Sequence, residues 1–313
     1  MSVFADGAEL EAAEAICSGG DIAQGHVFDL LTRLLDKSVL VKEDTGGHVR
    51  FRMLQGIREY GLECLRNSGE ETALRRRYLT WYLDLVDQAE AEWFGPHQQR
   101  WSIRLSREET NLRSAVDLCA QEPTLAQAGL RIAASAWHIR LGSGPLDAWR
   151  QQLSKVLTEG TIEPSLERAR ALQIDGWAAL LEGDNQTALQ RLQYCQHMNQ
   201  HLHDETFTTA TLQFGGLVAL FQGEFLSATD LLKQALTRQR ERQDHGAEST
   251  TLLLLTVTYS LTDDPRAISA ARRLVKLCQE HEAHISLSHA LWSMGITHYR
   301  RGQPQRTITL IKR

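Results

Sequence analysis

The sequence has few of the features that mark secreted, disulfide-linked or membrane proteins. Proline is scarce, with 6 in 313 residues, and no two cysteines form a CxxC pair. No apolar run approaches the roughly 18 residues that a membrane-spanning helix needs, and the first residues lack the basic lead of a secretory signal. We therefore expect a cytoplasmic protein without a membrane segment. The cysteines lie in apolar helical patterns and are predicted to be buried thiols: Cys17, Cys64, Cys119, Cys195 and Cys278.

An excess of positive charge is also lacking. The net charge is -5 with the 12 histidines counted as neutral, so the chain as a whole has no positive field to attract a phosphate backbone. Nucleic acid is therefore a disfavoured partner. The hydrophobic content of 42% and the charged content of 23% are typical of an ordinary globular protein.

The chain carries none of the short motifs that mark common catalytic sites. GxxxxGK[ST], GxGxxG and HExxH are all absent, which excludes a P-loop and the usual dinucleotide and zinc-protease signatures. Residues 142–144 read Gly-Ser-Gly but follow no strand, so a nucleophile elbow is not indicated. His197 and His201 are spaced to share a helical face, with His203 nearby, but a solvated helix end explains them better than a metal site. We predict that the chain is not an enzyme and holds no cofactor or metal.

Residues 1–66 change their hydrophobic period twice. Residues 10–17 and 25–40 show a helical period. Residues 38–42 and 49–53 then alternate as strands, and residues 43–48 between them carry the turn signal DTGG. A helical period returns from Leu54 onward. The order helix, helix, hairpin, helix predicts a winged-helix-like module with a further helix attached.

Residues 67–160 form a connecting region in which the helical period dominates. Short breaks such as GPH, QEP and GSGP separate the helical stretches. We expect helices at residues 71–92, 98–105, 111–119, 125–141 and 147–157.

Residues 161–313 repeat with a period of about 40. Gly216 lies 40 residues after Gly176, and Gly223 lies 40 residues after Gly183. Weaker copies run through residues 256–268 and 295–307. Each unit reads as a helix, a tight turn and a second helix, which predicts an α-solenoid of tetratricopeptide-like helical hairpins within a mainly α chain.

The repeat glycines have predicted roles. Gly176 and Gly216 would let neighbouring helices approach closely, whereas Gly183, Gly223 and Gly302 would take the left-handed conformation that ends a helix. The last copy stops in its second helix without a polar cap, so we expect the array to be incomplete and part of something longer.

Two sets of residues are candidates for binding. Aromatic side chains are typical of a ligand-binding groove on the concave face of such repeats, although packing between helices is the commoner role for these residues. The groove candidates are Trp137, Arg140, Trp149, Trp177, Phe214, Tyr259 and Trp292. The nucleic-acid candidates are the basic residues of the winged-helix-like module: Arg33, Lys37, Lys42, Arg50 and Arg52.

Several segments, in order, resemble one family. MSVFADGAELEAAEAIC resembles the "SVFAGG-(F/W)-(T/S)-LEAAEAVC" segment of bacterial STAND-type signal-transduction ATPases, many of them LuxR-type or related transcriptional regulators. FRMLQGIREYGLECLRNSGE resembles their "YRMLETIREYALERL..SGE", and SREETNLRSAVDLCAQ resembles "EHDNLRAAL.W". The similarity runs from residue 1 to about residue 160, and helical repeats follow in that family.

The resemblance implies a winged helix next to an NTPase core, followed by repeats that receive an inducer or partner. This chain departs from the family in lacking the NTPase core with its ATP site and a C-terminal helix-turn-helix. The resulting hypothesis is a non-catalytic sensor fragment, whose repeats bind a protein partner or small inducer and shift a population of conformations; self-association is left open. The alternative is direct DNA binding by the winged helix, with residues 25–37 as recognition helix and residues 42–52 as wing.

Overall fold

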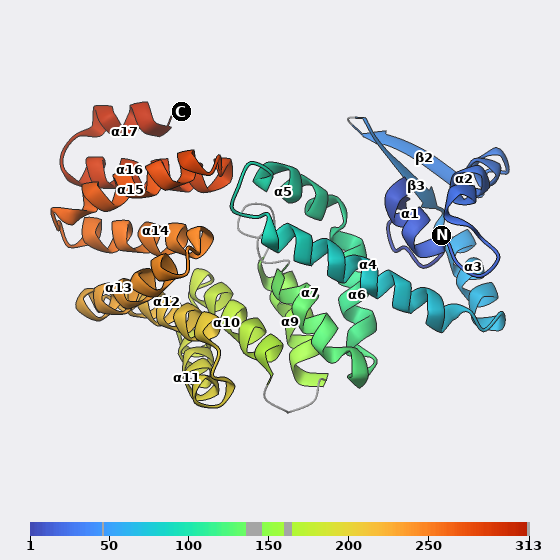
Figure 1. The fold of residues 1–313 in the computed structure, drawn as a ribbon, viewed down its shortest axis with the longest axis horizontal. Coiled ribbons are helices and arrows are strands. Elements are labelled where there is room, and N and C mark those ends of the chain that lie inside the picture. Colours follow the sequence, from blue (N-terminus) through green and yellow to red (C-terminus); the bar gives the residue numbers. More distant parts are fainter. Residues whose placement is uncertain (46, 136–145, 160–164, 312–313) are drawn as a thin grey trace.

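The structure is a computed structural model that describes residues 1–45, 47–135, 146–159 and 165–311 (Figure 1). A small sheet and short helices form the N-terminal end, and helices follow one another to the C-terminal end. The predicted fold class, a mainly α chain with a winged-helix-like module followed by an α-solenoid of helical hairpins, is confirmed.

The N-terminal module combines a three-stranded antiparallel sheet with two helices. The sheet order is β1-β3-β2, so the first strand pairs with the last. Phe4, Ile16 and Leu31 are buried and belong to the same hydrophobic core as Leu40 and Phe51 of the sheet. The elements are β1 (Ala8–Glu9), α1 (Leu10–Cys17), the 3-10 turn η1 (Gln24–His26), α2 (Val27–Asp36), β2 (Leu40–Thr45) and β3 (His48–Met53).

The hairpin is tighter than the sequence predicted. The pairing of β2 with β3 continues until Thr45 lies opposite His48, so the predicted loop at residues 43–48 is wrong by several residues. Asp44 explains the tight turn, because its side-chain Oδ1 accepts a hydrogen bond from the Gly47 backbone N–H at 3.1 Å. Gly47 has φ +84°, a conformation that glycine adopts without strain.

The connecting region is a set of helices that follow the predicted ranges closely. The predicted helix at residues 125–141 is described as far as residue 135, and residues 136–141 lie outside the described residues. α3 (Gln55–Asn67) is the further helix attached to the N-terminal module. The connecting region contains α4 (Glu71–Ala91), α5 (Gln98–Arg107), α6 (Glu109–Ala120), the 3-10 turn η2 (Pro123–Leu125), α7 (Ala126–Ser135) and α9 (Leu146–Glu159).

The repeats are pairs of antiparallel helices. In each pair the first helix packs on the second, and the first helices also pack on one another along the array. The first helices are α10 (Leu166–Leu181), α12 (Glu205–Phe221), α14 (His245–Leu261) and α16 (His284–Arg300). The second helices are α11 (Asn185–Leu202), α13 (Phe225–Glu241), α15 (Arg266–Glu280) and α17 (Pro304–Ile311).

The repeat glycines have the two roles that their spacing predicted. A Cβ atom on Gly176 would lie 2.3 Å from Phe214 Cζ, and one on Gly216 would lie 2.6 Å from Leu232 Cγ, so both glycines permit close helix packing. Gly183, Gly223 and Gly302 all have φ between +71° and +84°. They therefore end the first helix of their repeats in the left-handed conformation.

The cysteine prediction is wrong for two of the five residues. Cys119, Cys195 and Cys278 are buried, and burial raises the pKa of their thiols to about 12, 12 and 11. Cys17 is half-buried and Cys64 is exposed. Cys64 is exposed because α3 lies on the surface and contains no buried residue. Within the described ranges, no helix is long and apolar enough to cross a membrane.

Candidate functional site

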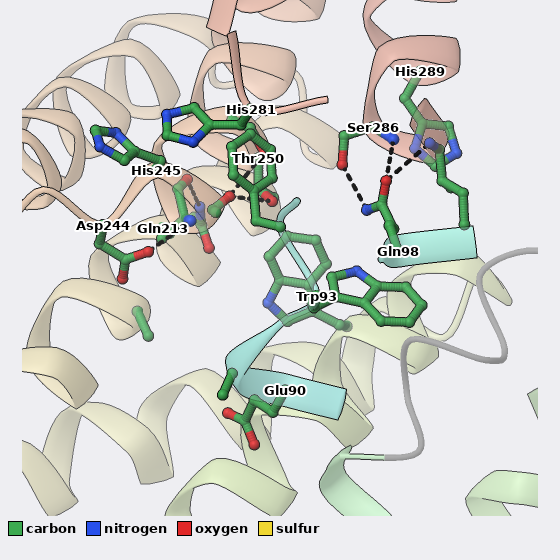
Figure 2. Close-up of a pocket in the computed structure, with 18 of the residues that line it drawn as sticks. Glu90, Trp93, Gln98, Gln213, Asp244, His245, Thr250, His281, Ser286 and His289 are labelled. Atoms are coloured by element: carbon green, nitrogen blue, oxygen red, sulfur yellow. Dashed lines mark hydrogen bonds between the residues drawn. The ribbon is translucent and has the colours of Figure 1, made fainter. Parts of the chain in front are cut away.

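A cleft lies between the inner helices of the repeats and the segment that joins α4 to α5. The first helices α10, α12, α14 and α16 form one wall. The end of α4, Trp93 and Phe94, and the start of α5 form the other wall (Figure 2). The volume of the cleft is about 770 Å³, which lies within the range of small-molecule sites in proteins.

One side chain closes the cleft at the α16 end. Gln98, the first residue of α5, is 1% exposed. Its Oε1 accepts hydrogen bonds from the backbone N–H groups of Ile285 at 2.8 Å and Ser286 at 3.1 Å, and its Nε2 donates to Ser286 Oγ at 3.0 Å (Figure 2). The first backbone donors of α16 lack a partner inside their own helix. Gln98 therefore caps α16 from a distant part of the sequence, and we call this contact the latch.

Beside the latch, the rings of Phe94, His281 and His245 contact one another in a row. The ring centroids of Phe94 and His281 are 5.4 Å apart, and those of His281 and His245 are 4.4 Å apart. The rings join the α4–α5 connection to both ends of the third repeat, because His245 begins α14 and His281 follows α15. His289 lies on the same side of the cleft (Figure 2), and the surrounding protein lowers the pKa of its imidazole by desolvation although the ring still reaches solvent.

The lining of the cleft is aromatic and polar with little positive charge. Trp93 and Trp177 contribute indole rings, and neutral amides come from Gln173 and Gln213. The described lining residues include no Lys or Arg, whereas Glu90 and Asp244 are acidic. An anion would therefore meet no formal positive charge here, so the cleft favours a neutral or weakly cationic ligand with an apolar ring.

The lining follows the repeat period. Gln213 lies 40 residues after Gln173, and Thr250 lies 40 residues after Ala210, and all four line the cleft. A second cavity of about 580 Å³ shares Glu90, Gln173 and Ala210 with it and extends toward α7. Together they form one groove along the inner face of the array.

The structure places the predicted groove residues in different environments, and not all of them line the cleft. Trp177 lines the cleft. Phe214 and Tyr259 are 0% and 6% exposed and pack between helices. Trp149 is buried and its Nε1 donates to the Ala133 carbonyl, whereas Trp292 is 52% exposed and lies outside the lining. Trp137 and Arg140 lie outside the described residues.

The basic residues predicted to contact nucleic acid also lie in different environments. Arg33, Lys37 and Lys42 are exposed. Arg52 forms ion pairs with Asp6 and Glu43, and Arg50 is 13% exposed and pairs with Glu108 at 2.6 Å. Two of the five basic side chains are thus already paired with carboxylates of the chain itself.

Arg50 belongs to a buried network that joins the N-terminal module to the connecting helices, which we call the module joint. Glu108 Oε2 accepts hydrogen bonds from Tyr82 Oη at 2.7 Å and Asn111 Nδ2 at 2.8 Å. Tyr78 Oη donates to the Asn111 carbonyl at 2.8 Å. Burial alone would lower the pKa of Arg50, but its hydrogen bond with Glu108 and the charge of Glu108 raise it.

The sequence did not reveal several residues of the cleft. Trp93, Phe94 and Gln98 follow α4 in a segment without a period, and His281 and His289 are separate polar residues in the repeats. Only the repeat register, which places Gln213 and Thr250 at equivalent spacings to Gln173 and Ala210, offered a signal. The histidines that the sequence did single out, His197 and His201, are exposed with ring centroids 4.8 Å apart. Groups of three or more potential metal ligands are absent from the described part of the chain.

Comparison with known proteins relates the chain to bacterial regulators. It is 26% identical over 279 residues to proteins named as HTH-type transcriptional regulators in Mycobacterium tuberculosis and Mycobacterium bovis, covering 87% of this chain and 31% of theirs. An uncharacterized Mycobacterium tuberculosis protein is 34% identical over 79 residues, which are 25% of this chain and 20% of that protein.

The other comparisons add less. A solved structure of a Podospora anserina kinesin light chain with TPR-like repeats superposes with a TM-score of 0.44 and 15% identity over 58% of this chain and 91% of that chain. No family model matches the sequence. The chain spans about a third of the length of the curated regulators that it matches.

Proposed function

We propose that the chain is a non-catalytic regulatory module of a bacterial transcriptional regulator of the STAND or LuxR type, and that its cleft binds a small effector. The observation that carries the proposal is the cleft of about 770 Å³, which the latch bridges at its α16 end. Its size and its indole rings fit a small molecule, and its polar side chains supply hydrogen-bonding groups that would orient such a ligand. The weak similarity to transcriptional regulators supports the regulatory role.

The latch explains how binding in this cleft would be transmitted. Gln98 contacts α16 directly beside the cleft, so a ligand that separates Trp93 from the repeat wall also strains the Gln98 cap. The effector would favour either the latched or the unlatched arrangement according to its relative affinity for each. The connecting helices would then carry the change to the N-terminal module, because the module joint holds the two together rigidly.

We place the protein in the cytoplasm, because all five cysteines are free and the reducing cytoplasm keeps thiols in that form. The proposal assigns the chain no reaction and no cofactor of its own. Protein partners would contact the exposed outer surface of the repeats, since the latch obstructs the concave face.

Direct DNA binding by the N-terminal module has less support. Arg50 and Arg52 would have to leave Glu108, Asp6 and Glu43 to reach a phosphate. Removing Arg50 from a buried pair would leave the carboxylate of Glu108 uncompensated. The exposed basic residues that remain, Arg33, Lys37 and Lys42, are fewer than a typical sequence-specific DNA-binding domain presents.

The experiment is a thermal-shift screen of the full chain against a library of small metabolites. A ligand at about 100 times its Kd stabilises the folded state by about 2.7 kcal/mol, which raises the Tm by several degrees. Ala210→Trp places an indole where the cavities meet and should abolish the shift. Trp292→Ala, outside the lining, should preserve it. Compounds that stabilise Ala210→Trp as strongly as the wild type would contradict an effector site in the cleft.

A further inference from the structure

A small side cavity adjoins the cleft between α12, α13 and α14. Its volume is about 50 Å³. It shares Ala210, Gln213, Asp244 and Ala247 with the wall of the cleft, and Gln239 of α13 is one of the residues that line it. A water molecule occupies about 30 Å³ in the liquid, so the cavity has room for a group of a few heavy atoms.

Gln239 is unpartnered in this cavity. The residue is 2% exposed, and neither its Oε1 nor its Nε2 has a hydrogen-bond partner. A buried polar atom left unpaired costs about 1–3 kcal/mol, and such atoms are normally paired with protein, water or ligand. Two unpaired atoms on one buried amide therefore indicate a group that enters the cavity.

The polar neighbours of Gln239 are already engaged. Gln213 Nε2 donates to Thr251 Oγ1 at 2.7 Å. Asp244 Oδ1 accepts from the Ala247 backbone N–H at 3.0 Å. Thr209 Oγ1 donates to the Glu205 carbonyl at 2.8 Å. These bonds fix the walls of the cavity and leave the amide of Gln239 to recognise an incoming group.

The charges around the cavity indicate that this group is neutral. Arg242 and Asp244 both line it, so a carboxylate would meet Asp244 and an ammonium group would meet Arg242. Arg242 also donates to Thr206 Oγ1, which holds its guanidinium in place. The side-chain amide of Gln239 has an oxygen that accepts hydrogen bonds and an NH2 group that donates them. A group that both donates and accepts hydrogen bonds would therefore pair with it fully.

We propose that the side cavity is a specificity subsite of the cleft, in which Gln239 pairs with an uncharged carboxamide or lactam group of a ring-bearing effector. The ring of the effector lies in the cleft, whose lining includes Trp93 and Trp177, and the carboxamide enters the side cavity. This inference rests on the proposed function and adds the chemical class of the effector. A site built to hydrogen-bond a particular group strongly rejects analogues without it, because its own polar atoms are then left unpaired.

The test uses three probes that share a ring and differ in the attached group: benzamide, benzoate and benzylammonium. Ligand-detected NMR on the full chain measures their dissociation constants. The expected result is that benzamide binds at least about tenfold more tightly than the other two. Gln239→Leu should abolish this preference while the Tm stays level or rises, because the substitution removes two unpaired buried atoms.

Two further variants make the result specific. Gln234→Leu, an exposed glutamine on the same helix α13, should leave the benzamide preference intact. Gln239→Glu keeps the shape of the side chain but removes the amide donor, and should weaken benzamide about tenfold or more even if Gln239→Leu folds poorly.

Some outcomes would overturn the subsite. These are equal binding of the three probes, no binding by any of them, and benzamide binding that Gln239→Leu and Gln239→Glu leave unchanged. Each outcome leaves the effector site itself to be judged by the Ala210→Trp screen, so failure of the subsite and failure of the proposed function are distinguishable.

Discussion

Two of the long-range contacts in the described part of the chain, the module joint and the latch, are of opposite character. The module joint joins the N-terminal module to the connecting helices through a charged pair, Arg50 and Glu108, and a set of buried hydrogen bonds. The latch joins the connecting helices to the fourth repeat through the single neutral side chain of Gln98. None of Arg50, Tyr82, Glu108 and Asn111 lines the cleft, whereas Gln98 of the latch forms part of its wall.

The difference suggests which contact opens during function. Breaking the joint leaves a buried charge without its partner, which costs several kcal/mol. Breaking the latch exposes only two backbone N–H groups and one amide, and water can replace their partners at a net cost of about 1 kcal/mol each or less. A ligand with ordinary differential affinity can therefore open the latch but not the joint.

The largest effect is expected from Glu108→Ala, which breaks the module joint. The substitution leaves the guanidinium of Arg50 buried and also removes the acceptor for Tyr82 and Asn111. We expect the free energy of unfolding to fall by about 3–5 kcal/mol, measured by urea denaturation.

Glu109→Ala is the matched control, because this neighbouring carboxylate lies in a partly exposed pair with Arg113. It should cost about 0.5 kcal/mol or less. Equal losses from the two variants would show that the joint is no stronger than a surface ion pair.

Alkaline pH should weaken the joint next most strongly. Burial raises the pKa of Tyr78 and Tyr82 above their usual value, and the charge of Glu108 raises both further. Their stabilising contribution is complete below the unfolded pKa of about 10 and is lost as the pH rises above it, because only the unfolded chain then releases these protons. The unfolding free energy should fall by up to about 1.4 kcal/mol per pH unit for each phenol.

Urea titrations between pH 8 and pH 11.5 measure this slope. Tyr82→Phe removes one of the two phenols and should flatten the slope, whereas Tyr299→Phe, at a residue that is 68% exposed, should leave it unchanged. A slope that Tyr82→Phe does not alter would mean that the joint does not sense alkaline pH.

The fold was more predictable than the cleft because the two depend on different kinds of signal. Gly176, Gly183 and their counterparts recur in register, so the hairpins could be predicted from spacing alone. The cleft depends on Gln98 meeting Ile285, two residues that are 187 positions apart, and no local pattern connects them. Phe214 was a reasonable groove candidate by type, but Gly176 leaves a space opposite its ring, and the ring fills that space inside the core.

A smaller effect is expected from Gln98→Ala, which opens the latch without breaking the joint. The substitution removes the acceptor for the N–H groups of Ile285 and Ser286, and loss of a helix cap costs about 1 kcal/mol. We expect hydrogen-exchange protection at the start of α16 to fall about fivefold, while protection in α6 at the joint stays as in the wild type.

Ser286→Ala weakens the latch without removing it. It removes only the bond from Gln98 Nε2 and keeps both backbone donors capped, so its loss of protection at α16 should be smaller than that of Gln98→Ala. Loss of protection in α6 as well as α16 would show that latch and joint open as one unit. The connecting helices would then be coupled to both ends of the chain, and an effector that opens the cleft would also loosen the N-terminal module rather than move it as a rigid body.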